Sequence, residues 1–262
     1  MSDDSVYSLP LLAGYPEDAI RIPDHSGEPY VAVLERLHRE LSPKTYLEIG
    51  AQNGQSLALA RCPSIAIDPD FRIASNVFPG KRSCHLFQMS SDDFFANYDP
   101  TKVLNGRLDF AFLDGMHWFE FLLRDFINTE RHANPNSIIA LHDCVPLDTY
   151  SVRRNIHDTA NQEISRHPEW WAGDVWKTLY ILRRYRPDLK IYVFDAPPTG
   201  LVLITCLDPN SNFLQQNYFH IVEESVEMNL ADIGVSEFAQ SVSIRSTLSL
   251  SSRSDIHKLF WL

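Results

Sequence analysis

Four polar side chains stand at the ends of two apolar segments, where they could do acid–base or metal chemistry. Asp114 and His117 follow the segment LDFAFL. His142 and Asp143 follow the segment SIIAL. Imidazole titrates near neutral pH and can take a proton from a hydroxyl group, while carboxylates are the oxygen ligands that Mg²⁺ prefers. The alternative interpretation is that all four residues only cap helices and turns.

A second candidate site is the turn GAQNG, which follows the first apolar segment. Gly50 and Gly54 let the backbone pass close to a ligand, and the start of a following helix would offer free N–H groups. Asp68 ends the next apolar segment, where an acid can accept hydrogen bonds from ribose hydroxyls. Gln52 and Asn53 break the GxGxxG spacing, which argues against a nicotinamide dinucleotide. A turn without a ligand is the alternative.

The elements that must position these residues follow from hydrophobic periodicity. Short apolar segments alternate with helical patterns, which predicts βαβ units and a parallel sheet. The predicted strands are 45–49, 64–67, 85–88, 108–113 and 137–141, followed by 190–194 and 200–206. The linker between the last two has hairpin length, so we expect them to pair antiparallel. The predicted helices are 29–42, 56–60, 119–127, 153–165, 174–185 and 214–222.

Length and composition exclude several classes. The chain has 262 residues and a net charge of −11, which argues against a nucleic-acid or anionic membrane surface. Its beginning lacks the pattern of a signal peptide, and no apolar run is long enough to span a membrane. The four cysteines are far apart, which indicates reduced thiols and a cytoplasmic protein. Residues 1–27 read as an irregular arm that could pair subunits of a homo-oligomer or cover a pocket.

Four motifs occur in a fixed order between residues 46 and 143: ExGxxxGxS, IDP, DFAFLDGMH and IIALHD. This series resembles the class I S-adenosylmethionine-dependent methyltransferases, and among them the small-molecule O-methyltransferases with DGxH and HD at strand ends. The resemblance implies an α/β fold: a Rossmann-like, seven-stranded, mostly parallel sheet with an antiparallel closing hairpin and helices on both faces. It implies an N-terminal arm and helix (1–44), a methyltransferase domain (45–207) with an acceptor-binding insert at about 145–186, and a C-terminal helical extension (208–262).

The resemblance also implies roles for individual residues. The implied cofactor-binding set is Glu48, Gly50, Ala51, Gly54, Ser56, Asp68, Ser91, Asp92 and Asp114. His117 is the candidate general base, and His142 and Asp143 could orient the acceptor. Asp114 and Asp143 are candidate ligands of a divalent metal such as Mg²⁺. Metal-dependent relatives often carry Asn or Asp where this chain has Cys144, and thiolate is a poor Mg²⁺ ligand, so metal dependence stays open.

The aromatic stretch WWAGDVWK, residues 170–177, lies where this family commonly inserts acceptor-binding elements. Trp176, Lys177 and Asp174 are therefore candidate acceptor contacts, because indole rings stack on sugars and aromatic rings and lysine can meet an anionic group. The alternative is a helix that is anchored on the core by its tryptophans, with Asp174 as its N-cap.

The function that these observations predict is methyl transfer from S-adenosylmethionine to a hydroxyl of a small metabolite such as a sugar, a polyketide or a phenolic compound. The partner is then a small-molecule acceptor, with neither nucleic acid nor membrane involved. Two alternatives stay open: a nicotinamide-dependent oxidoreductase on a similar sheet, and a non-catalytic ligand-binding or assembly domain of the same fold.

Overall fold

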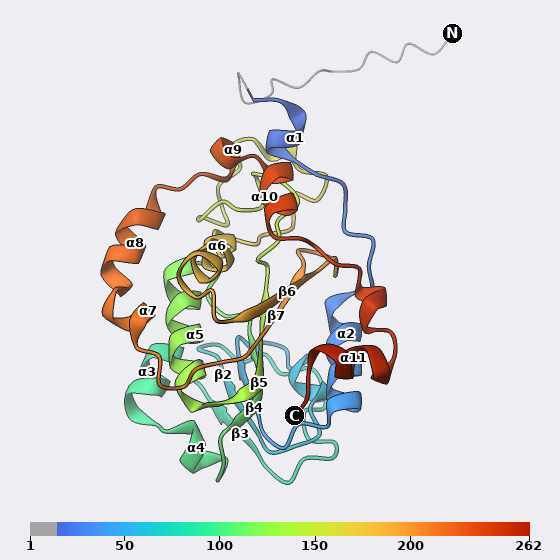
Figure 1. Cartoon of the computed structure of the whole chain (residues 1–262), viewed down its shortest axis with the longest axis vertical. Coiled ribbons are helices and arrows are strands. Elements are labelled where there is room, and N and C mark those ends of the chain that lie inside the picture. Colours follow the sequence, from blue (N-terminus) through green and yellow to red (C-terminus); the bar gives the residue numbers. More distant parts are fainter. Residues whose placement is uncertain (1–14) are drawn as a thin grey trace.

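A seven-stranded sheet forms the centre of the computed structural model, which describes residues 15–262 (Figure 1). The strand order is β3-β2-β1-β4-β5-β7-β6. The first five strands pair in parallel, and β7 is antiparallel to both β5 and β6. The strands are β1 Tyr46–Ile49, β2 Ser64–Ile67, β3 Cys84–Phe87, β4 Leu108–Leu113, β5 Ala133–His142, β6 Lys190–Phe194 and β7 Leu201–Thr205. The predicted mixed sheet and its closing hairpin are confirmed.

Helices cover both faces of this sheet. In Figure 1, α2 and α11 lie on one side of the strands, and α5, α6 and α8 lie on the other. The helices are α1 Glu17–Ile20, α2 Tyr30–Leu41, α3 Ser91–Asn97, α4 Pro100–Val103, α5 Phe119–His132, α6 Trp176–Tyr185, α7 Phe213–Gln216, α8 Tyr218–Val226, α9 Leu230–Ile233, α10 Val235–Ser241 and α11 Arg253–Leu259. Three 3₁₀ turns, Leu57–Leu59, Gln162–Ile164 and Thr247–Leu250, complete the elements of residues 15–262. None of the helices that the structure describes is long and apolar enough to cross a membrane.

Successive side chains of a strand point to opposite faces of the sheet, and a hydrophobic core lies on each face. In β4, Phe110 and Phe112 face the core under α2, while Ala111 and Leu113 face the core under α5. Because both faces are covered, the central strands read as continuous apolar runs rather than alternating ones. The C-terminal region closes both cores, since α10 contributes to the core under α5 and the end of α11 to the core under α2.

Two predicted helices are wrong. The segment 56–60 forms only the 3₁₀ turn Leu57–Leu59, because Pro63 and the start of β2 leave no room for a longer helix. The segment 153–165 forms only a turn at Gln162–Ile164. There, the side chains of Asn155 and Asp158 each accept a backbone N–H two residues further on, which competes with helical hydrogen bonding.

The N-terminal arm bonds to the loop after β5 and to the connection between β6 and β7. Its residues 15–29 include the short helix α1, and residues 1–14 of the predicted arm lie outside the described part of the chain. The Ile22 N–H donates to Leu147 O at 2.8 Å, and the Tyr30 N–H donates to Pro197 O at 3.2 Å. These bonds place the start of α2 at the same sheet edge as the polar strand ends.

Candidate active site

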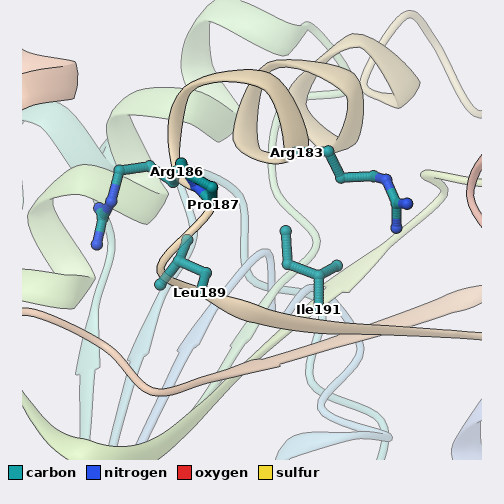
Figure 2. Close-up of a pocket in the computed structure, with 5 residues that line it drawn as sticks. All are labelled: Arg183, Arg186, Pro187, Leu189 and Ile191. Carbon is teal, nitrogen blue, oxygen red and sulfur yellow. The ribbon is translucent and has the colours of Figure 1, made fainter.

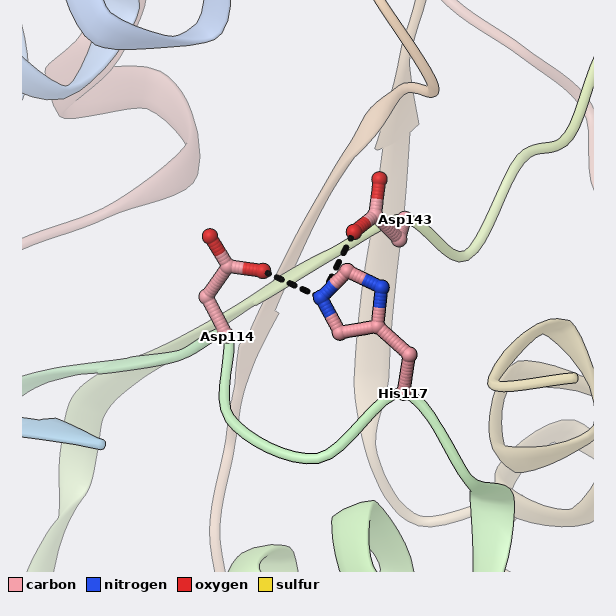
Figure 3. Close-up of side chains that lie close together, drawn as sticks. All are labelled: Asp114, His117 and Asp143. Carbon is pink, nitrogen blue, oxygen red and sulfur yellow. Dashed lines mark ion pairs between the residues drawn. The ribbon is translucent and has the colours of Figure 1, made fainter. Parts of the chain in front are cut away.

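Asp114, His117 and Asp143 converge at the carboxyl edge of the sheet (Figure 3). The two aspartates follow the neighbouring strands β4 and β5, and His117 reaches them from the loop between β4 and α5. Nε2 of His117 lies 3.3 Å from Oδ2 of Asp143 and 3.7 Å from Oδ1 of Asp114. The sequence therefore predicted this grouping, because the carboxyl ends of adjacent parallel strands share one edge.

The orientation of His117 is set by the segment 171–174. Nδ1 of His117 donates to the carbonyl of Trp171 at 2.8 Å, and the imidazole stacks on the Trp171 indole with ring centroids 4.7 Å apart. A carbonyl can only accept, so the proton sits on Nδ1 and the lone pair of the neutral ring sits on Nε2. Gly173 has φ +63°, and a Cβ there would lie 1.8 Å from the His117 carbonyl oxygen. Only glycine therefore lets this segment pack so closely on the histidine loop.

His142 lies beneath the two carboxylates as a buried cation. Its Nδ1 is 3.3 Å from Oδ1 of Asp114 and 3.4 Å from Oδ1 of Asp143. Burial alone would lower the pKa of His142, but the charges of Asp143 and Asp114 outweigh burial and raise the pKa to about 10. Burial would likewise raise the pKa of Asp143, but His142 and His117 hold it well below its usual range. The cluster thus keeps Asp143 ionised.

Asp143 has an unusual backbone. Its φ of +60° lies in the left-handed region, which few residues other than glycine, asparagine and aspartate enter readily. The Thr199 hydroxyl, from the β6–β7 connection, donates to its Oδ1. The turn points the Asp143 carboxylate at His117 and sends Cys144 the other way, where its thiol is fully buried and bonds to His142 O. Cys144 therefore does not line the site.

The glycine turn packs against protein on two sides. A Cβ on Gly50, where φ is +86°, would lie 1.9 Å from the Asp114 carbonyl oxygen, so the turn after β1 touches the loop after β4. The carbonyls of Gln52 and Asn53 accept from the N–H groups of Arg72 and Ala74, both at 2.9 Å. Since no α-helix follows the turn, the predicted helix N-terminus that would offer free N–H groups does not form here.

Asp68 stands beside this turn, at the end of β2. It is 7% exposed, and its Oδ2 and Oδ1 accept the backbone N–H groups of Gln52 (2.8 Å) and Asp70 (2.7 Å). Each carboxylate oxygen can accept two hydrogen bonds, so one acceptor position remains on each. Ala51 is buried in the turn, and Gly54, with φ +78°, packs under Val77.

Glu48 and Ser56 bond to each other inside the protein. Oε1 of Glu48 accepts from the Ser56 hydroxyl at 2.6 Å, and Oε2 accepts from the Tyr46 hydroxyl at 2.7 Å. Burial raises the pKa of Glu48 to about 7, although these two hydrogen bonds oppose the rise. Both carboxylate oxygens are thus occupied by side chains, which supports a role in holding the glycine turn on β1.

Ser91 and Asp92 open α3, next to the end of β3. Arg124 of α5 binds the Asp92 carboxylate through Nε (2.9 Å) and Nη2 (2.6 Å). The start of α3, which carries these two predicted cofactor-binding residues, is therefore tied to α5 by an ion pair.

The three predicted acceptor contacts have their partners inside the protein. Trp176 is 1% exposed and packs edge-on against Phe238 in the core. Lys177 donates to Val226 O at 2.8 Å and lies 3.2 Å from Oδ2 of Asp174. The sequence suggested Asp174 as the N-cap of its own helix α6, and this is wrong. Asp174 instead accepts the N–H of Phe119 at the start of α5. Their placement thus gives no support to contact with an acceptor.

Two residues at the site were missed by sequence reasoning. Trp171 was treated as a core anchor, although it stacks on His117. Tyr30, the first residue of α2, packs against His142 with the rings tilted and their centroids 4.0 Å apart. Burial, followed by the charges of Asp114 and Asp143, raises the pKa of the Tyr30 hydroxyl well above its usual range. The position of Tyr30 at the start of a helix does not indicate a residue of the site. For Trp171, the pair of tryptophans beside a glycine was a usable indication.

The cluster of Asp114, His117 and Asp143 fits a divalent cation. One ligand atom from each residue lies within 4.8 Å of the other two. Histidine ligands of metals commonly donate their second ring N–H to a carbonyl, as His117 does to Trp171. Two carboxylates and one imidazole suit Mg²⁺ or Mn²⁺, and the imidazole favours Mn²⁺.

A small pocket of about 220 Å³ lies elsewhere, between the end of α6 and β6. Figure 2 shows Arg183 and Arg186 at its rim, with the Arg186 guanidinium turned away from it. That guanidinium pairs with Glu130 at 2.7 Å and Asp188 at 2.7 Å. The charge of Arg186 is therefore balanced within the protein, and the pocket is remote from the polar cluster.

Comparison with known proteins agrees with the fold. Residues 47–144 match the family model described as a methyltransferase domain. No curated protein sequence matches the chain significantly. The sheet order with an antiparallel β7 differs from the parallel sheet of dinucleotide-binding folds, which argues against the oxidoreductase alternative. Residues 47–144 are therefore similar to a methyltransferase domain, and this similarity agrees with the mixed seven-stranded sheet.

Several solved structures are similar to the chain at low identity. The O-methyltransferase TomG from Streptomyces achromogenes, in complex with SAM, is 13% identical, with a TM-score of 0.47 over 71% of this chain and 84% of that one. An O-methyltransferase from Bacillus cereus with SAH is 14% identical, with a TM-score of 0.43 over 70% and 83%. The SAH-bound methyltransferase PaMTH1 of Podospora anserina is 13% identical, with a TM-score of 0.47 over 68% and 78%. These values are too low to transfer an acceptor, a metal or a residue's role.

Proposed function

We propose that the enzyme methylates a hydroxyl group of a small metabolite, such as a sugar, a polyketide or a phenolic compound, and that His117 takes the hydroxyl proton. The observation that carries this proposal is the placement of Nε2 of His117, 3.3 Å from Asp143 and 3.7 Å from Asp114 at the sheet edge. A hydroxyl is a weak nucleophile until its proton is removed, and an imidazole at this position can remove it.

The chain's own residues supply the proton chemistry. Nδ1 of His117 is bonded to the Trp171 carbonyl, so Nε2 is the atom that accepts the proton. The negative charges of Asp143 and Asp114, which lie at this same nitrogen, then stabilise the imidazolium. The acceptor oxygen forms its bond to the methyl carbon while the carbon–sulfur bond breaks, and the sulfonium becomes the neutral thioether of S-adenosylhomocysteine.

The cofactor would lie across the carboxyl ends of β2, β1 and β4. The two free acceptor positions on Asp68 match the two adjacent hydroxyls of a ribose. The close contact of Gly50 with Asp114 brings the glycine turn next to the polar cluster, so a sulfonium beside Gly50 would be within reach of it.

The polar cluster would hold a divalent cation through Asp114, Asp143 and Nε2 of His117. A cation there would lower the pKa of the acceptor hydroxyl. In that case Nε2 serves as a ligand rather than as the proton acceptor, and activity depends on the metal.

The test compares His117→Ala with His167→Ala, a matched control that also removes a histidine stacked on a tryptophan (centroids 3.8 Å) but away from the polar cluster. Calorimetry with S-adenosylhomocysteine and transfer of labelled methyl to a panel of hydroxylated metabolites are measured with EDTA and with Mg²⁺ or Mn²⁺. We expect His117→Ala to bind S-adenosylhomocysteine normally and to lose at least 100-fold in turnover.

Unchanged turnover in His117→Ala would remove His117 from the mechanism. Full activity of the wild type in EDTA would exclude a metal role. Binding without transfer to any acceptor would favour the non-catalytic alternative, and no binding of S-adenosylhomocysteine would overturn the proposed function.

A further inference from the structure

Thr199 is a buried polar residue that the proposed chemistry does not use. It lies in the connection between β6 and β7 and is 2% exposed. Its hydroxyl donates to Oδ1 of Asp143, which follows β5. Nδ1 of His142 lies 3.4 Å from the same oxygen. A carboxylate oxygen has two acceptor positions, so these two donors engage Oδ1 of Asp143 inside the protein.

Backbone contacts hold Thr199 in this place. Its carbonyl accepts the N–H of Val145 at 2.9 Å, which bonds the β6–β7 connection to the loop after β5. The next residue, Gly200, has φ +79°, and a Cβ there would lie 2.5 Å from the Val145 side chain. The Tyr30 N–H donates to the Pro197 carbonyl at 3.2 Å and ties the same connection to the start of α2. These contacts fix the Thr199 hydroxyl relative to the end of β5.

The other oxygen of Asp143 is turned toward the polar cluster. Figure 3 shows one carboxylate oxygen of Asp143 facing His117 and the second one pointing away. The facing oxygen, Oδ2, lies 3.3 Å from Nε2 of His117. Nδ1 of His117 carries the proton of the neutral ring, so Nε2 presents a lone pair to Oδ2, and these two acceptors repel unless a positive charge lies between them. Asp143 therefore offers one oxygen to a cation at this point.

A carboxylate that offers one oxygen discriminates between divalent cations. Mg²⁺ and Mn²⁺ take octahedral geometry, in which a single carboxylate oxygen fills one position. Ca²⁺ takes more oxygen ligands and binds carboxylates through one oxygen or through both. The Thr199 hydroxyl withholds Oδ1 of Asp143 from binding through both. Removal of a group that orients a metal ligand typically changes metal affinity by about 10- to 100-fold.

We infer that Thr199 is a positioning residue of the polar cluster: it holds Oδ1 of Asp143, leaves Oδ2 as the oxygen that this side chain offers to a divalent cation, and gives the cluster a preference for Mn²⁺ over Ca²⁺. The inference rests on the metal-binding part of the proposed function. Valine has the shape of threonine without the hydroxyl, whereas serine keeps the hydroxyl, so the two replacements separate hydrogen bonding from packing.

The experiment measures the dissociation constants of Mn²⁺ alone and of Ca²⁺ alone, by calorimetry, on protein that has been stripped with EDTA and dialysed. The proteins are the wild type, Thr199→Val, Thr199→Ser and Thr205→Val. Thr205 is a matched control: it is also 2% exposed, lies at the far end of β7 and donates its hydroxyl to the Asn136 carbonyl at 3.3 Å. Thr199→Ala removes the same hydroxyl and takes the place of Thr199→Val if that variant does not fold.

We expect the wild type, Thr199→Ser and Thr205→Val to bind Mn²⁺ at least about 10-fold more tightly than Ca²⁺. In Thr199→Val, Mn²⁺ binding should weaken about 10-fold while Ca²⁺ binding stays as tight or becomes tighter, so the preference should vanish. An unchanged preference in a folded Thr199→Val protein, checked by its thermal midpoint, would overturn the inference. An equal loss of preference in Thr199→Ser or Thr205→Val would overturn it as well.

A wild type that binds neither ion would also overturn the inference. Calorimetry with S-adenosylhomocysteine and methyl transfer in EDTA, on the same preparation, separate that result from a failure of the proposed function. Binding and transfer without metal would leave the proposed function standing, with His117 as the base. No binding of S-adenosylhomocysteine would overturn the proposed function itself.

Discussion

Gly173→Ala is the substitution that most directly tests how His117, the proposed general base, is positioned. The backbone of Gly173 packs directly on the His117 carbonyl. A Cβ at this position would lie 1.8 Å from the His117 carbonyl oxygen and 2.7 Å from its Cβ. Since real Cβ contacts are not shorter than 3.0 Å, the two segments must separate by more than 1 Å.

The structure gives the size of the effect. A left-handed φ in a non-glycine residue costs about 1–2 kcal/mol, and overpacking of a tight contact costs about 1–3 kcal/mol more. We therefore expect the free energy of unfolding to fall by about 2–5 kcal/mol. The shift also moves the Trp171 carbonyl and indole away from His117, and a misplacement of about 1 Å in a reacting group can lower turnover 100-fold.

The assay combines urea unfolding, S-adenosylhomocysteine calorimetry and methyl transfer. Gly106→Ala is the control, because the nearest atom to its Cβ would be 3.9 Å away, at Thr45. We expect Gly173→Ala to stay folded, to bind S-adenosylhomocysteine within about twofold of the wild type and to lose most of its turnover, while Gly106→Ala keeps it. Wild-type stability and turnover in Gly173→Ala would refute the proposed role of the 171–174 segment.

Three further predictions follow from other contacts. Asp68→Ala should weaken S-adenosylhomocysteine binding about 10- to 100-fold, whereas Asp70→Ala, at the neighbouring exposed carboxylate, should not; equal affinities in calorimetry would contradict the ribose assignment. Lys177→Met should lower the free energy of unfolding by about 1–3 kcal/mol, because Lys177 is 3% exposed and pairs with Asp174. The Michaelis constant of the acceptor should not change, and a raised Michaelis constant would support Lys177 as an acceptor contact. Burial lowers the pKa of His38 to about 3, so the unfolded chain binds more protons and His38 destabilises the fold as pH falls below about 6.5. Relative to His38→Leu, the wild type should lose stability between pH 6.5 and 5 in urea unfolding, with a slope that approaches about 1.4 kcal/mol per pH unit, and parallel pH profiles would contradict this.

The sheet could be predicted from sequence because its strands are buried on both faces. The segments YLEI, SIAI, LDFAFL and SIIAL are short apolar runs with sharp ends, so hydrophobicity alone locates them. The helix expected at 153–165 failed because its asparagine and aspartate side chains bond to their own backbone. The short helix expected at 56–60 failed because the proline and strand that follow it limit its length. Those effects depend on local geometry, which periodicity does not report.

The candidate site was predictable only where it lies at strand ends. Asp114 and Asp143 follow adjacent strands, and His117 lies three residues after Asp114, so topology alone groups them. The contribution of Trp171 depends on how an irregular insert folds back over the edge, and the tryptophan pair beside a glycine was the signal that the sequence offered for it. For Lys177 and Trp176, the charged and aromatic side chains suggest a binding surface, whereas in the structure both are buried; their role as acceptor contacts stays a prediction.

The left-handed turn at Asp143 limits which side chains this position can carry. Glutamate, although equally acidic, lacks the tolerance of aspartate for this backbone and is longer by one methylene, so it would strain the end of β5 and push its carboxylate past His117. Asparagine shares both the shape and the backbone preference of aspartate. It is consequently the replacement that removes the negative charge while leaving the main chain in place, and a natural homologue that dispensed with this charge would be expected to carry asparagine or glycine there.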